Sequence, residues 1–170
     1  DYRAEIQHLY RNGMVGGLST GIAAVDKLFT IVPGQLSVIT GIPGSGKSEF
    51  VDQLMVNLAR LHKWKFAVAS FENPPPLHIA KLAEKIVGKP FFDGPTPRMS
   101  AEESEEALAY IKQHWMFLEH RSGEHSTIES ILDRAQQAIM RMGCRGLLID
   151  PSNYLRPTHK AELEHPFHNA

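Results

Sequence analysis

Several features that define whole classes of protein are scarce or missing in this sequence of 170 residues. Cysteine occurs once, at Cys144, so no disulfide can form within the chain, and this usage fits a reducing compartment. No apolar run approaches the roughly 20 residues that a membrane-spanning helix needs, so we expect no membrane partner. The N-terminus also lacks the basic stretch followed by an apolar stretch that is typical of a signal peptide.

An excess of charge of one sign is missing as well. The formal net charge is −1, from 18 Lys and Arg against 19 Asp and Glu. A nucleic-acid partner would therefore have to be held by a local groove, because no overall attraction is available. The composition is otherwise ordinary, with 42% hydrophobic and 22% charged residues, and the length suits one globular domain with a buried core.

The most informative stretch is residues 41–48, which match the phosphate-binding pattern G-x-x-x-x-G-K-S. Residues 35–40 before it have the pattern of a buried strand, and residues 49–62 after it repeat apolar residues at helical spacing. Glycines allow the backbone N–H groups of such a loop to point at phosphate oxygens, and the start of the following helix adds its positive dipole end. The pattern predicts an ATP-binding loop formed by Gly41, Pro43, Gly44, Ser45, Gly46, Lys47 and Ser48. In this loop the ammonium group of Lys47 would contact the β- and γ-phosphates, and the Ser48 hydroxyl would bind Mg²⁺.

Beyond the loop, strand patterns alternate with helix patterns. The sequence predicts strands at 66–70, 116–119 and 146–150, and helices at 77–87, 101–114 and 128–142. Capping boxes at 100–103 and 126–129 begin the last two helices, and Gly143 ends the final one. This alternation predicts an α/β fold with a mainly parallel sheet and helices on both of its faces.

Two carboxylates follow strands of this predicted sheet, where ligands of open parallel sheets bind. Asp150 closes an almost entirely apolar strand, which is the position of a Mg²⁺-binding Walker B aspartate. Glu72 follows the strand at 66–70, from where a carboxylate can orient or deprotonate the water that attacks the γ-phosphate. Each residue also has a plainer interpretation, Asp150 as a turn residue before Pro151 and Glu72 as a surface glutamate beside three prolines.

Six short motifs in this order resemble a known family. They are Thr20-Gly21, Val25-Asp26, Pro33-Gly34, the extended loop 40–48, Ser70-Phe71-Glu72-Asn73 and the run 148–153. Together they resemble the RecA-like motor domain of hexameric replicative DNA helicases, in the branch of Twinkle and the phage primase–helicases related to DnaB. The resemblance covers residues 17–155, and the motifs around Glu72 and Asp150 make it more specific than the phosphate loop alone.

The resemblance implies a function and a set of roles. The chain would be the ATP-binding and ATP-hydrolysing core of a 5′–3′ replicative helicase that acts as a ring, normally a hexamer, on single-stranded DNA. Lys47 and Ser48 would bind nucleotide and Mg²⁺, Glu72 would be the catalytic carboxylate assisted by Lys47, and Asp150 would be the Walker B residue. The location would be the cytoplasm of a bacterial or phage-infected cell, or an organelle matrix.

The end of the sequence departs from the family pattern. In the family a further strand lies between the strand of the phosphate loop and the Walker B strand, but residues 156–170 have no apolar strand pattern. We therefore expect an N-terminal arm over 1–17, a RecA-like P-loop NTPase core over 18–156 that is truncated after the Walker B strand, and a tail over 157–170. Two other hypotheses remain: a nucleotide-binding module or fragment without motor activity, and a recombinase-type RecA relative.

Overall fold

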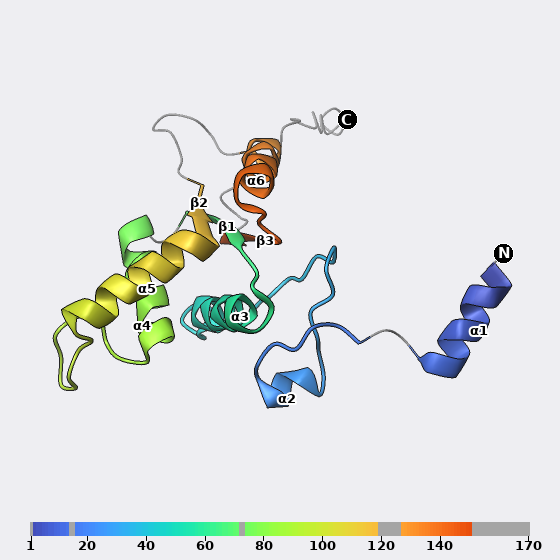
Figure 1. The fold of residues 1–170 in the computed structure, drawn as a ribbon, viewed down its shortest axis with the longest axis horizontal. Coiled ribbons are helices and arrows are strands. Elements are labelled where there is room, and N and C mark those ends of the chain that lie inside the picture. The colour runs from blue at the N-terminus through green and yellow to red at the C-terminus, as the bar shows by residue number, and fades with distance from the viewer. Residues whose placement is uncertain (1, 14–15, 72–73, 119–126, 151–170) are drawn as a thin grey trace, which may run out of the picture.

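The computed structural model describes residues 2–13, 16–71, 74–118 and 127–150. Its helices are α1 (Tyr2–Asn12), α2 (Ala23–Asp26), α3 (Lys47–His62), α4 (Pro75–Val87), α5 (Ala101–His114) and α6 (Ile128–Met142). Its strands are β1 (Phe66–Ser70), β2 (Trp115–Phe117) and β3 (Gly146–Asp150). The chain therefore alternates between strands and helices from β1 onward, as the sequence predicts (Figure 1).

The three strands form one parallel sheet in the order β2-β1-β3. The register pairs Phe66 with Trp115 on one side of β1 and with Gly146 on the other. At the far end of β1, Ser70 is paired with Asp150. The carboxyl ends of β1 and β3 consequently lie level with each other at one edge of the sheet.

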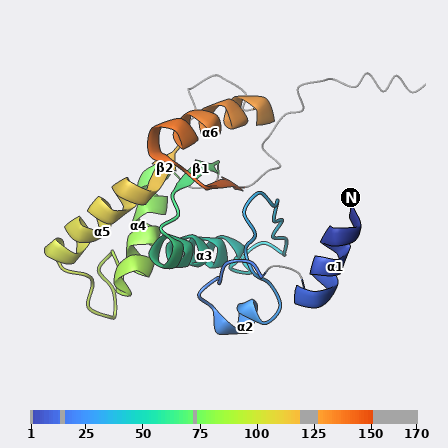
Figure 2. The same cartoon turned by 45° about the vertical axis from the view of Figure 1, so that its right-hand side comes forward.

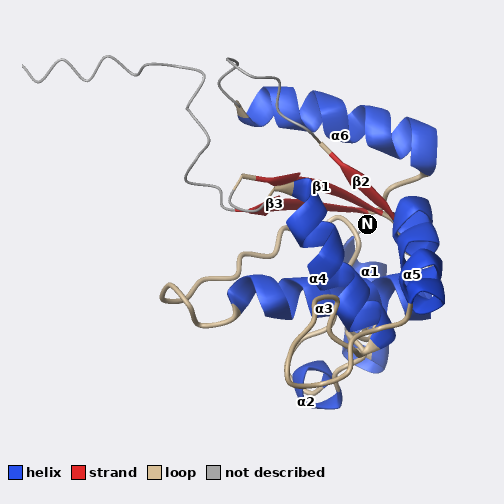
Figure 3. Ribbon diagram, turned by 90° about the vertical axis from the view of Figure 1, so that its left-hand side faces the viewer, coloured by secondary structure: helices blue, strands red, loops and turns tan. Residues whose placement is uncertain are grey.

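Helices cover both faces of the sheet (Figure 3). Phe66 and Val68 of β1 belong to a core shared with α3, α4 and α5. Ala67 and Ala69 belong to a second core shared with α6, because successive side chains of a strand point to opposite faces. The predicted α/β class, with a parallel sheet between two helical layers, is confirmed and is consistent with a RecA-like fold.

Most predicted helix ends are confirmed by their capping contacts. The Ser100 hydroxyl accepts a hydrogen bond from the Glu103 N–H, and the Glu103 carboxylate accepts one from the Ser100 N–H, which completes the capping box of α5. Gly143 ends α6 with a φ of 71°. The box predicted over 126–129 is wrong by one residue. Thr127, one residue after the predicted capping residue Ser126, is the N-cap of α6 and accepts from the Ser130 N–H, while the helix begins at Ile128 as predicted.

The strand predicted over 35–40 is not formed. These residues have no strand partner among the described residues, and the side chains of Leu36 and Val38 are 90% and 75% exposed. An apolar run favours a strand, but a strand exists only where a neighbour accepts and donates its backbone hydrogen bonds. The almost entirely apolar pattern of β3 is typical of a strand buried on both faces, but β3 lies at the edge of the described sheet and Leu147 is 37% exposed.

The N-terminal helix α1 lies apart from the sheet and its covering helices in two views (Figures 1 and 2). None of its residues is buried, and Tyr2, Ile6 and Tyr10 are all more than half exposed. The proposed division into an arm at 1–17, a core at 18–156 and a tail at 157–170 stays a prediction. No helix in the described ranges is long and apolar enough to cross a membrane.

Candidate functional site

Residues 41–46 of the stretch 41–48 form an exposed loop that leads directly into α3. Gly44 and Gly46 have φ values of 75° and 85°, which side chains with a Cβ rarely adopt. The loop is closed by local backbone contacts, in which the Ser45 N–H donates to the Ile42 carbonyl at 3.3 Å. Gly46 is the N-cap of α3. The loop therefore ends where the free N–H groups and positive dipole end of a 16-residue helix begin, which favours an anion.

Lys47 and Ser48 are the first two residues of α3, and their side chains face different partners. The ammonium group of Lys47 donates to the Ile42 carbonyl at 3.0 Å, so it lies over the loop that would hold the phosphates. Neither residue is fully buried. An exchange of the carbonyl contact for a phosphate oxygen would replace a neutral acceptor by a charged one, which strengthens the hydrogen bond.

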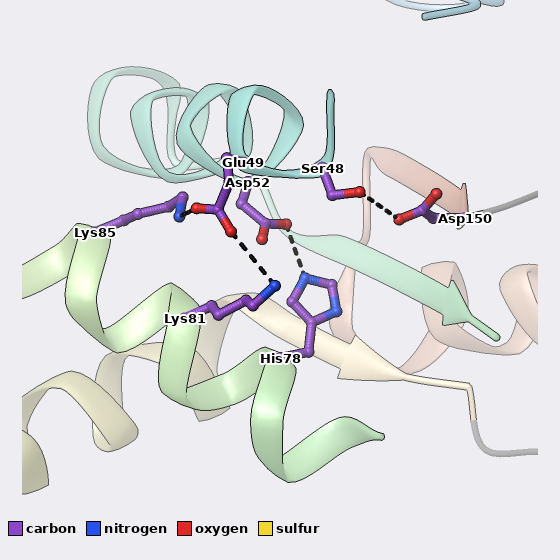
Figure 4. Close-up of polar contacts among 7 residues, drawn as sticks. All are labelled: Ser48, Glu49, Asp52, His78, Lys81, Lys85 and Asp150. Atoms are coloured by element: carbon purple, nitrogen blue, oxygen red, sulfur yellow. Dashed lines mark hydrogen bonds and ion pairs between the residues drawn. The ribbon is translucent and has the colours of Figure 1, made fainter. Parts of the chain in front are cut away.

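Ser48 and Asp150 lie together although 102 positions separate them in the sequence. The Ser48 hydroxyl donates to the Asp150 carboxylate at 3.1 Å, as Figure 4 shows. α3 supplies the serine and the end of β3 supplies the aspartate, so two elements converge at the carboxyl edge of the sheet. Hydroxyl and carboxylate oxygens are the ligands that Mg²⁺ prefers, and the two side chains are close enough to share one ion. The residues present therefore fit the predicted metal.

Glu72 lies outside the described residues, and so do Asn73 and the residues that follow Asp150. The described chain leaves β1 at Ser70 and Phe71 and resumes at Pro74, the N-cap of α4. The catalytic role of Glu72 therefore stays a prediction. No group of three or more potential metal-ligating side chains occurs within the described ranges, so any Mg²⁺ site there would rest on few protein ligands and on the nucleotide itself.

The spacing between Thr20 and Asp26, which belong to two of the motifs named above, has a structural explanation. The Asp26 carboxylate accepts hydrogen bonds from the Ser19 hydroxyl, the Thr20 N–H and the Thr20 hydroxyl at 2.5–2.6 Å. These bonds, that of Ser19 foremost, lower the pKa of Asp26 below its usual range. The Asn57 amide of α3 donates to the Thr20 carbonyl at 3.0 Å, so this cluster fastens the segment before the loop to the helix after it.

Sequence reasoning missed a second polar contact of α3, between Asp52 and His78. The two side chains meet at 2.8 Å and are only 3% and 4% exposed. From the sequence alone, Asp52 has the plain interpretation of an acidic residue near a helix start, where it suits the helix dipole, and nothing singles out His78. A signal did exist, because Asp52 stands at helical spacing before the buried Met55, Val56 and Ala59, on what is otherwise an apolar face.

Glu49 is the third residue of α3 whose side chain makes a polar contact with another element. Its carboxylate forms ion pairs with Lys85 and, at 3.4 Å, with Lys81 of α4. The hydrogen bond from Lys85 is the main cause that lowers the pKa of Glu49. These ion pairs give Glu49 a structural role between α3 and α4 at the surface.

The parallel sheet between helical layers makes the chain an α/β protein whose fold is consistent with the RecA-like type. Compared with known proteins, it is 40% identical to the "Twinkle homolog protein, chloroplastic/mitochondrial" of Arabidopsis thaliana, in an alignment of 174 residues that includes 97% of the chain. The resemblance predicted from the motifs, to a Twinkle- or DnaB-like helicase domain, is thereby confirmed. The chain spans about a quarter (24%) of that relative's length. No protein-family model matches the chain, and no solved structure matches it.

Proposed function

We propose that this chain is the ATP-binding and ATP-hydrolysing core of a ring-forming replicative DNA helicase of the Twinkle type. The observation that carries the proposal is the meeting of Ser48 and Asp150 at the start of the phosphate-loop helix. A chance glycine-rich turn would not bring an aspartate from a strand 102 residues away to the serine of the pattern. The similarity to a Twinkle homolog over 97% of the chain supports the same proposal.

The proposed roles rest on the phosphate-loop pattern, on the contact between Ser48 and Asp150 and, for Glu72, on the family resemblance. The loop N–H groups and Lys47 bind the phosphates, and Lys47 also stabilises the charge that develops on the γ-phosphate. Ser48 and Asp150 hold Mg²⁺, which when bound neutralises phosphate charge. Glu72 orients the attacking water and accepts its proton. Single-stranded DNA, a hexameric ring and an organelle matrix are the partners, assembly and location that the similarity favours.

Two measurements test this proposal, first nucleotide binding and then ATP hydrolysis. We expect a fluorescent ATP analogue to bind in the presence of Mg²⁺, and Lys47→Ala to weaken binding at least tenfold, since a charge-assisted contact to phosphate is lost. We further expect ATP hydrolysis that single-stranded DNA stimulates and that Glu72→Gln reduces at least 100-fold while binding persists. Unchanged binding by Lys47→Ala would refute the loop assignment, and unchanged turnover by Glu72→Gln would refute the catalytic assignment.

A second candidate is a nucleotide-binding module without motor activity. The exposure of Leu36 and Val38 favours it, because the segment before the loop is not anchored in the described sheet. A loop anchored only through α3 and the cluster around Thr20 can bind phosphate without holding it rigidly for reaction. Binding that Lys47→Ala abolishes, combined with no turnover at any protein or DNA concentration, would establish this candidate over the helicase core.

A further inference from the structure

The buried contact between Asp52 and His78 adds little to the stability of the fold, because burial of both polar side chains costs free energy of desolvation. Its two side chains are 3% and 4% exposed, so both lose almost all their hydration in the folded protein. The carboxylate only accepts hydrogen bonds, so Nε2 of His78 carries the proton of the 2.8 Å contact. The other ring nitrogen, Nδ1, is buried and has no partner among the described residues. Two apolar side chains of similar size would hold the helices together at least as well.

The hydrogen bond between Asp52 and His78 fixes the relative position of the two helices, which apolar contacts do less strictly. Side chains in an apolar contact can slide past one another, whereas a short hydrogen bond fixes both distance and angle. The rings of Phe117 and His78 also form a T-shaped contact, with ring centroids 5.5 Å apart and an interplanar angle of 76°. His78 is therefore held between α3 and β2 and has little freedom to turn.

The position of the pair links two parts of the proposed ATPase site. Asp52 lies one helical turn after Ser48, on the same side of α3 (Figure 4). His78 lies in the first turn of α4, which begins at Pro75 directly after the chain that leaves β1. A shift of α4 along α3 would thus change the spacing between the phosphate loop and the start of α4.

We propose that Asp52 and His78 are positioning residues for ATP turnover. Their hydrogen bond fixes the first turn of α4, together with the N-cap Pro74 whose carbonyl accepts from the His78 N–H at 3.1 Å, against the helix that carries Lys47 and Ser48. This inference rests on the proposed ATPase function. It concerns the catalytic rate and not the binding of nucleotide, because neither side chain belongs to the loop 41–48.

Two single variants separate the hydrogen bond from simple packing. The side-chain amide of Gln reaches about as far as Nε2 of histidine, so His78→Gln keeps a donor for Asp52, while the shorter His78→Asn places its amide near Nδ1 and loses it. In the full 170-residue chain we expect kcat to stay within about threefold for His78→Gln and to fall roughly 10- to 100-fold for His78→Asn. The nucleotide Kd should stay within about threefold for both, since the loop is unchanged.

A double variant and a surface control complete the experiment. Asp52→Leu/His78→Leu should unfold at a temperature no lower than the original chain, yet lose kcat to the same degree as His78→Asn. Lys81→Ala removes a contact of Glu49 between the same two helices at the surface and should keep both kcat and Kd. Equal kcat in His78→Gln and His78→Asn, or an unchanged kcat in the double variant, would overturn the positioning role. Absence of turnover in the original chain would refute the proposed ATPase function together with this inference, whereas normal turnover in all variants refutes the inference alone.

Discussion

The pairing of Gly146 with Phe66 gives the sharpest test of the sheet. A Cβ atom added at Gly146 would lie 2.5 Å from both Cδ1 and Cε1 of the Phe66 ring. Carbon atoms in contact are normally separated by about 3.5–4.0 Å, so the ring edge would have to move by about 1 Å. Phe66 is 4% exposed and packs between the rings of Trp64 and Trp115, with centroids 6.1 and 5.9 Å away. The ring has no free space into which it could move.

We therefore expect Gly146→Ala to lower the free energy of unfolding. Overpacking of a core by one methyl group costs about 1–3 kcal/mol, and the lower entropy of the unfolded alanine chain returns about 0.4–1 kcal/mol. A net loss of about 1–2 kcal/mol should lower Tm by about 2–8 °C in a chain of this size. Denaturant unfolding followed by tryptophan fluorescence suits the measurement, because Trp64 and Trp115 both flank the ring that must move.

Gly94→Ala is the matched control for this substitution. Gly94 lies in a loop, and a Cβ added there would meet no atom within 4 Å, so the change should stay within about 0.5 kcal/mol. Phe66→Leu supplies the second control, because leucine lacks the ring edge that clashes. In the Phe66→Leu background the cost of Gly146→Ala should shrink to less than half. An unaltered free energy of unfolding in Gly146→Ala, or the same cost in both backgrounds, would show that the strand register is not as described.

Three further predictions concern other contacts. Glu49→Gln should lower the free energy of unfolding by at most about 1 kcal/mol at neutral pH. Because the pKa of Glu49 lies below its ordinary value of 4.5, this difference should be full above that pH and vanish as the pH falls through the lowered pKa; a difference that persists in acid contradicts the ion-pair explanation. Burial raises the pKa of the Cys144 thiol, so a thiol reagent should label it slowly in native buffer and completely in denaturant, whereas fast native labelling would contradict its burial. Ser100→Ala should cost about 1 kcal/mol through loss of the α5 cap, measured by thermal unfolding, and no loss would mean that the cap contributes nothing.

The sequence predicted those parts of the fold whose causes are local. Capping residues and helical spacing placed α5 and α6 to within a residue or two, and apolar runs placed β1 and β3. The strand pattern over 35–40 was as clear as that of β3, yet only β3 is paired. Pairing depends on which other strand occupies the adjacent position in the sheet, and a local pattern does not contain that information.

In the candidate site, too, the features with local causes were predictable and those that depend on the packing of distant elements were not. The phosphate loop was predictable because a short pattern fixes both its shape and its chemistry. The pairing of Ser48 with Asp150 was expected from a general rule for parallel sheets and was then found at 3.1 Å. The pair of Asp52 and His78 was not predicted, because a buried polar contact between two helices depends on how those helices pack.

The shape of the phosphate loop does not require the strand that was expected before it. Its two left-handed glycines, its turn between Ile42 and Ser45 and its cap on α3 are all contacts within the stretch 42–50. What a paired strand would add is a fixed position of this loop relative to the sheet, and in the described chain three side chains of α3 provide that position instead. Ser48 reaches β3, while Glu49 and Asp52 reach α4. Because a phosphate-binding shape is local and a catalytic geometry is not, loss of the buried contact of Asp52 should affect turnover before it affects binding.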